Sequence, residues 1–160
     1  LNNSPHVREE KREAVLKAAK KFNFRPNISA RQLASNRSYV ITHFYDNLNT
    51  DYLSKIYTGM QQACHKNGYY AVAEAQDCSK KKFIQQTLEY VSTFNIDGLI
   101  LSPPLCDDAA LISALKKQGI KMVLISPQET RDEDYFVFVD EEKSAFEITE
   151  HLINIGHEHI

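Results

Sequence analysis

The chain lacks several features on which common catalytic sites depend. It has 160 residues, with only five glycines and three cysteines. Because the glycines stand one at a time, there is no glycine-rich loop to cradle a phosphate and no Gly-x-Ser-x-Gly turn to present a nucleophile. Cys64, Cys78 and Cys106 are odd in number and widely spaced, which favours free thiols in a reducing compartment over a disulfide framework. We therefore predict that the chain is not an enzyme and needs no cofactor.

Long hydrophobic runs are also missing. No apolar stretch approaches the roughly 18 residues of a membrane span, and residues 1–5 do not form a signal peptide. With 42% hydrophobic and 10% aromatic residues, the composition is that of a soluble globular protein with a real core. The sequence predicts a cytoplasmic protein made of one domain and an appendage.

Charge is divided unevenly along the chain. Residues 1–38 hold nine Lys or Arg against three Glu, a net +6, whereas the rest holds ten basic against 18 acidic residues, a net −8. This asymmetry predicts that the basic arm meets a polyanion while the acidic body is repelled from it. The alternative, a solvated helix face, explains any single lysine but explains the asymmetry less well.

Residues 25–35, here called the connector, read as a short basic helix. Pro26 ends whatever precedes it, and either Asn27 or Ser29 can cap a new turn. The small apolar residues of the connector share one helical face: Ala30, Leu33 and Ala34. Isolated helices need about 12 to 15 residues to persist in water, so two turns require a partner. A second copy of the connector and a DNA groove would provide such a partner.

The flanking residues predict further elements. Residues 9–22 form a helix, because Val15, Ala18 and Phe22 repeat at helical spacing. After residue 38, apolar runs alternate with amphipathic stretches, which predicts an α/β fold with a parallel, doubly wound sheet. The expected strands are 39–45, 69–74, 98–101, 121–125 and 136–139; the expected helices are 51–67, 80–94, 107–118 and 143–155.

The connector carries a motif that resembles the lactose-repressor and galactose-repressor family of bacterial transcription regulators, whose headpiece ends in Tyr-x-Pro-Asn-x-x-Ala-x-x-Leu. Phe24 replaces the tyrosine, and the other positions match. The resemblance implies that two such hinge helices pair in the minor groove of operator DNA, where Leu33 pries apart a base step. The implied DNA-binding residues are Asn27, Ala30, Arg31 and Leu33. The other interpretation, that Leu33 and Ala30 only dock the segment onto its own domain, stays open here.

The resemblance extends to the whole chain, since residues 97–101 and 151–157 agree with the regulator core in order and spacing. It implies a helix-turn-helix headpiece remnant at 1–26, a hinge helix and linker at 27–38, and an incomplete periplasmic-binding-protein-like effector subdomain at 39–160. Family members run to twice this length, so we expect a fragment or truncated product that lacks most side chains for major-groove reading. The implied protein is a homodimeric transcriptional repressor.

A ligand site is expected where the strands end, because open α/β sheets bind ligands beyond their carboxyl ends. In the family this site holds a small-molecule effector, such as a sugar. Ser126 stands where the family has an acceptor carboxylate, which puts a standard sugar in doubt, and Leu53 departs from the family's aromatic pair. The expected effector-binding residues are Tyr52, Leu53, Ser102, Ser126 and Asp140, with ordinary loop structure as the alternative for each. Asp140 is expected to contact the effector or to accept a hydrogen bond at the strand end.

Two competing interpretations are weaker. His151, His157 and His159 lack the spacing of a helical ligand pair, so we predict no metal site. A solute-binding receptor of the periplasmic type, without DNA binding, would share the core fold. Such a receptor needs an export signal and has no use for a basic connector. The sequence has the basic connector and shows no export signal.

Overall fold

The computed structural model describes residues 8–24, 27–46, 50–130 and 134–160. Pro26, which was predicted to end the element before the connector, lies outside the described residues. The chain divides into two compact units, residues 1–37 and 38–160. No helix among the described residues has both the length and the apolar content needed to cross a bilayer.

The first unit contains two helices. In α1 (Glu9–Lys21), acidic side chains occupy the first turn and lysines the last, which suits the helix dipole at both ends. The eight-residue α2 (Ile28–Ser35) is the predicted connector helix. Asn27 caps it, because its side-chain oxygen accepts a hydrogen bond of 2.9 Å from the Ser29 backbone N–H. Asn36 closes the other end in the left-handed conformation, with φ of 53°.

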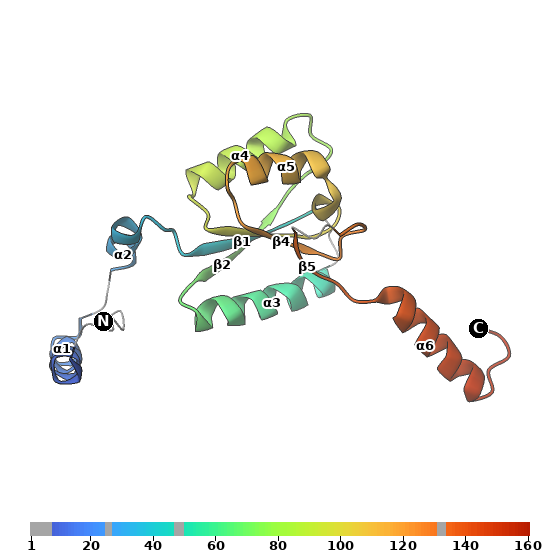
Figure 1. The fold of residues 1–160 in the computed structure, drawn as a ribbon, viewed down its shortest axis with the longest axis horizontal. Coiled ribbons are helices and arrows are strands. Elements are labelled where there is room, and N and C mark those ends of the chain that lie inside the picture. Colours follow the sequence, from blue (N-terminus) through green and yellow to red (C-terminus); the bar gives the residue numbers. More distant parts are fainter. Residues whose placement is uncertain (1–7, 25–26, 47–49, 131–133) are drawn as a thin grey trace. The chain divides into compact units, whose positions relative to one another are not determined.

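The second unit is built on a five-stranded parallel sheet with strand order β2-β1-β3-β4-β5, which confirms the predicted fold class (Figure 1). The strands are β1 (Val40–Tyr45), β2 (Tyr70–Ala75), β3 (Gly98–Leu101), β4 (Met122–Ile125) and β5 (Tyr135–Val137). Figure 1 shows α3 on one face of the sheet and α4 and α5 on the other, as a doubly wound arrangement requires. These helices are α3 (Thr50–Lys66), α4 (Phe83–Thr93) and α5 (Ala109–Lys117).

The main core lies between the sheet and the α4–α5 layer. Phe44 of β1 pairs in register with Leu101 of β3, and both are fully buried. Leu111 and Leu115 of α5 are fully buried in the same cluster. The Tyr90 ring of α4 meets the Phe44 ring edge-on, with 5.6 Å between the centroids. Burial of this face fixes the sheet that carries the strand-end loops.

The start of β1 is held by a side chain from the segment before β3. Asp97 accepts hydrogen bonds from the backbone N–H of Ser38 at 3.0 Å and of Tyr39 at 3.2 Å. Tyr39 has a φ of 57°, a strained value for a residue with a side chain, and its ring packs on Tyr69 at 5.6 Å. The carboxylate therefore stabilises an unfavourable backbone conformation at the first residues of the second unit.

Helix boundaries depart from prediction where a carboxylate caps a helix. The segment predicted as one helix at 107–118 begins as a short 3-10 turn, Leu105–Asp107, and then becomes α5. The break arises because Asp108 accepts from the Leu111 backbone N–H at 2.9 Å and so sets the start of α5. Likewise α6 (Glu141–Asn154) starts two residues before the predicted 143, because Asp140 accepts from the Lys143 N–H at 2.9 Å.

Candidate functional site

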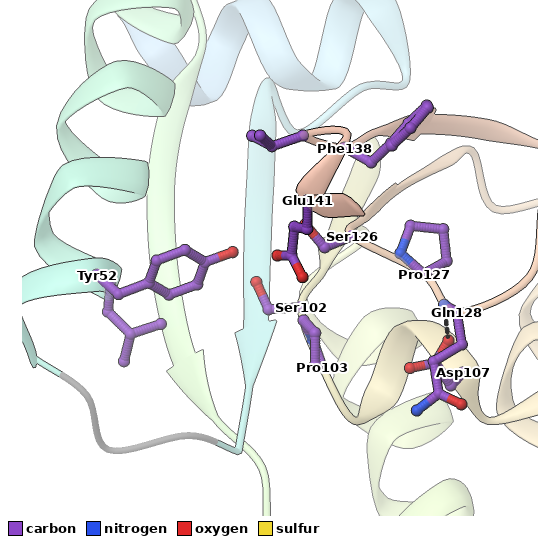
Figure 2. A pocket seen from close by; sticks show the side chains of 11 residues that line it. Tyr52, Ser102, Pro103, Asp107, Ser126, Pro127, Gln128, Phe138 and Glu141 are labelled. Atoms are coloured by element: carbon purple, nitrogen blue, oxygen red, sulfur yellow. Dashed lines mark hydrogen bonds between the residues drawn. The ribbon is translucent and has the colours of Figure 1, made fainter. Parts of the chain in front are cut away.

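A cavity of about 520 Å³ lies at the carboxyl ends of the strands, where a ligand site was expected (Figure 2). Tyr52 and Leu53 reach it from the first turn of α3. Ser102 comes from the end of β3 and Ser126 from the end of β4. Thus four of the five residues named from the sequence line one space. Asp140 is not among the described lining residues.

Asp140 has a different place in the structure. Its side-chain oxygen caps α6 by accepting from the Lys143 backbone N–H. The residue after it, Glu141, is the one that lines the cavity. The two roles expected for Asp140, effector contact and hydrogen-bond partner at the strand end, both stay predictions.

Ser102 rests on a buried histidine. Ser102 Oγ lies 2.7 Å from Nε2 of His43, and both residues are 1% exposed. Burial lowers the pKa of His43, so the imidazole is neutral at pH 7. Its ring also lies 5.7 Å from that of Tyr45, centroid to centroid. The pair fixes one hydroxyl at the wall of the cavity without adding charge.

Two loops of the cavity are joined through Asp107. Its Oδ1 accepts a hydrogen bond of 2.7 Å from the Gln128 backbone N–H, drawn as a dashed line in Figure 2. Its Oδ2 lies 3.6 Å from Sγ of the buried Cys106. Burial and the neighbouring carboxylate raise the pKa of the Cys106 thiol to about 12, so the thiol stays protonated at neutral pH. The cavity wall therefore has a fixed carboxylate but no thiolate at this position.

The last two loops shape the far side of the cavity. Ser126 adopts the left-handed conformation, with φ of 46°, and its backbone N–H donates to the Val137 carbonyl oxygen at 2.8 Å. Phe138 and Glu141 then line the cavity after β5. In Figure 2 the Glu141 carboxylate lies between Tyr52 and Ser126.

Sequence reasoning did not name Asp107, Phe138 or Glu141 as site residues. Asp107 is the first residue of the helix predicted at 107–118 and lies six positions after the predicted strand end at Leu101. Glu141 directly follows the named Asp140, so its position beside the strand end was the only signal.

The expected DNA-binding residues lie on or next to α2. Asn27 caps the helix, and Ala30 and Arg31 are exposed. Leu33 is 87% exposed, an unusual state for a leucine in an amphipathic helix. The wedge role stays a prediction, as does the alternative that Leu33 docks the segment onto its own domain.

Comparison with known proteins gives a family match over the second unit. Residues 38–160 match the family model described as periplasmic binding proteins and sugar binding domain of LacI family.

Curated relatives and solved structures extend the match to the first unit. HTH-type transcriptional regulator RegA of Clostridium acetobutylicum is 28% identical over 162 residues, covering 98% of this chain and 47% of the relative. Catabolite control protein A of Staphylococcus xylosus is 30% identical over 159 residues, with the same coverage of 98% and 47%. The lac repressor dimer bound to operator and the anti-inducer ONPF has the same fold, with a TM-score of 0.66 at 23% identity over 98% of this chain and 47% of that one. The chain spans about half the length of these relatives.

Proposed function

Because this chain belongs to the family of periplasmic binding proteins and LacI-type sugar-binding domains, we propose that it is part of a DNA-binding transcriptional repressor controlled by a small-molecule effector. The observation that carries the proposal is α2, a capped helix of eight residues that leaves Leu33 87% exposed. A helix of this length is marginal alone in water, so it needs an external partner. The named regulators and the repressor structure support the choice of DNA as that partner.

At the DNA, two copies of α2 pair in the minor groove of an operator. Leu33 enters a base step as an apolar wedge and bends the duplex. Ala30 lets the two helices approach closely, and Arg31 contacts phosphate. Asn27 caps the helix and directs its N-terminal N–H groups at the backbone of the DNA.

Charge supports the same arrangement. Residues 1–37 hold nine basic and three acidic side chains, and residues 38–160 hold ten basic and 18 acidic ones. Phosphates attract the first unit and repel the second. The protein therefore meets DNA through its first unit.

The effector occupies the cavity at the strand ends. Tyr52 and Leu53 pack on its apolar faces, while Ser102 and Ser126 hydrogen-bond to its hydroxyl groups. Asp140 acts indirectly, because its cap sets the first turn of α6. Ligand occupancy changes DNA affinity by favouring one arrangement of the two subunits, and this requires a homodimer.

A gel-shift titration against salt tests this function with the full-length protein. The duplex is first selected by that protein from a random library, and candidate metabolites are added afterwards. We expect a steep fall of affinity with salt, since phosphate contacts release counterions. A protein that binds ligands but shifts no duplex at low salt would instead be a solute-binding receptor.

A further inference from the structure

The part of the cavity wall that the structure describes is negatively charged. Among its described lining residues, Asp107 and Glu141 carry carboxylates and none is Lys or Arg. Figure 2 shows the Glu141 carboxylate pointing into the cavity beside the hydroxyl groups of Ser102 and Ser126. A charged group that faces a binding cavity selects its ligands by sign.

No described residue forms an ion pair with Glu141. On the same helix, Lys143 pairs with Glu147 at 3.7 Å, and on α3 Lys55 pairs with Asp51 at 2.9 Å. The lysines closest in sequence to the cavity thus have other acidic partners. The first turn of α6 also stabilises an anionic side chain, because the helix dipole is positive there.

The Asp107 carboxylate is held in place by contacts to both of its oxygens. The Gln128 N–H at 2.7 Å and the Cys106 thiol at 3.6 Å hold its two oxygens in place. A carboxylate has about four lone-pair sites, so these contacts leave acceptor capacity for a ligand.

The neutral groups around the carboxylates suit a hydroxylated molecule. Ser102 is 1% exposed and its Oγ lies 2.7 Å from Nε2 of His43, so the position of its hydroxyl oxygen is fixed. Burial lowers the pKa of His43, so this support adds no positive charge to the wall. Tyr52 adds an aromatic side chain to the cavity lining, and an aromatic ring can contact C–H groups or a cation.

We infer that the cavity takes a polyhydroxylated ligand bearing a cationic amine, with Glu141 as the counter-ion and Ser102 as the hydrogen-bond partner of an adjacent hydroxyl. The inference rests on the proposed function, since the cavity is the proposed effector site. Asp107 supplies a second acceptor at the other side of the ligand. A phosphorylated ligand would place its negative charge beside two carboxylates and binds poorly.

Calorimetry on the full-length protein tests the ligand class with three probes that share one sugar ring: glucosamine, glucose and glucose 6-phosphate. The pH is set so that the amine is protonated. A hydrogen bond to a charged group contributes enough for about a tenfold difference in affinity, so glucosamine should bind about tenfold more tightly than glucose. Glucose 6-phosphate should bind most weakly.

Two matched variants locate the effect. Glu141→Gln keeps the shape and removes the charge, and it should abolish the preference for glucosamine over glucose. Glu142→Gln removes the same charge one residue further along α6, at a position outside the described lining, and should keep the preference. Equal loss in both variants would reflect overall charge and would overturn the role of Glu141.

The inference is overturned if glucosamine binds no more tightly than glucose, or if glucose 6-phosphate binds best. These outcomes leave the proposed function standing, because DNA binding is measured separately by the salt-dependent gel shift. A full-length protein that binds no duplex but prefers the amine would overturn the proposed function and support the ligand class.

Discussion

Replacing Leu33 by alanine tests whether this side chain contacts DNA or stabilises the free protein. Leu33 is 87% exposed, so its side chain contributes little to the stability of the free protein. If it enters a base step, nearly all of its burial occurs in the complex. Leu33→Ala removes three buried carbons at about 0.8 kcal/mol each, or about 2 kcal/mol per subunit. Two symmetric wedges then contribute about 4 kcal/mol, so operator affinity should fall on the order of a thousandfold.

The assay is fluorescence anisotropy with the selected duplex, combined with energy transfer between the duplex ends to measure bending. The full-length variant should lose affinity and bending but keep its melting temperature and its ligand affinity. Leu16→Ala is the matched control, because Leu16 is a half-exposed leucine on α1 of the same unit. The reasoning fails if Leu33→Ala binds and bends the duplex as well as the unchanged protein, or if its melting temperature falls.

Five further substitutions test the fold by urea denaturation. Asp97→Ala should lower the free energy of unfolding by about 2–4 kcal/mol, because it leaves two backbone N–H groups at the start of β1 without their acceptor. Asp77→Ala, at an exposed turn, should leave the free energy of unfolding nearly unchanged. Equal effects of the Asp97 and Asp77 substitutions would refute the stabilising role of Asp97 at the start of β1. Thr42→Val should raise the free energy of unfolding by about 1 kcal/mol, because the buried Thr42 hydroxyl has no hydrogen-bond partner among the described residues. Thr87→Val should lower it by about 1 kcal/mol, because the Thr87 hydroxyl donates at 2.9 Å; a loss in both variants would contradict this account. The pKa of His43 is lowered on folding, so the unfolded chain binds the proton first and stability should fall as pH drops below about 6.5. His43→Gln should weaken this dependence, and an unchanged pH profile would contradict it.

The strands and helices were largely predictable because their signals are local. Residues 99–101 and 123–125 are continuous apolar runs, as is typical of strands buried on both faces. The errors occur at helix starts, where one hydrogen bond decides the boundary. Asp108 and Asp140 each reach an N–H three residues ahead, and sequence spacing does not say which of two adjacent acidic residues does so.

The cavity was only partly predictable. Tyr52, Ser102 and Ser126 follow from the rule that strand ends gather at one edge of the sheet. Glu141 was missed because the side chain that turns inward after β5 depends on the cap at Asp140. The pairing of His43 with Ser102 joins residues 59 positions apart, and no local pattern encodes it.

The Asp97 carboxylate also joins segments that are far apart in the sequence. It accepts from Ser38 and Tyr39, which precede it by 59 and 58 positions. The conformation at the entry to β1 therefore depends on the segment before β3, and local opening of that segment would also release the turn at Tyr39.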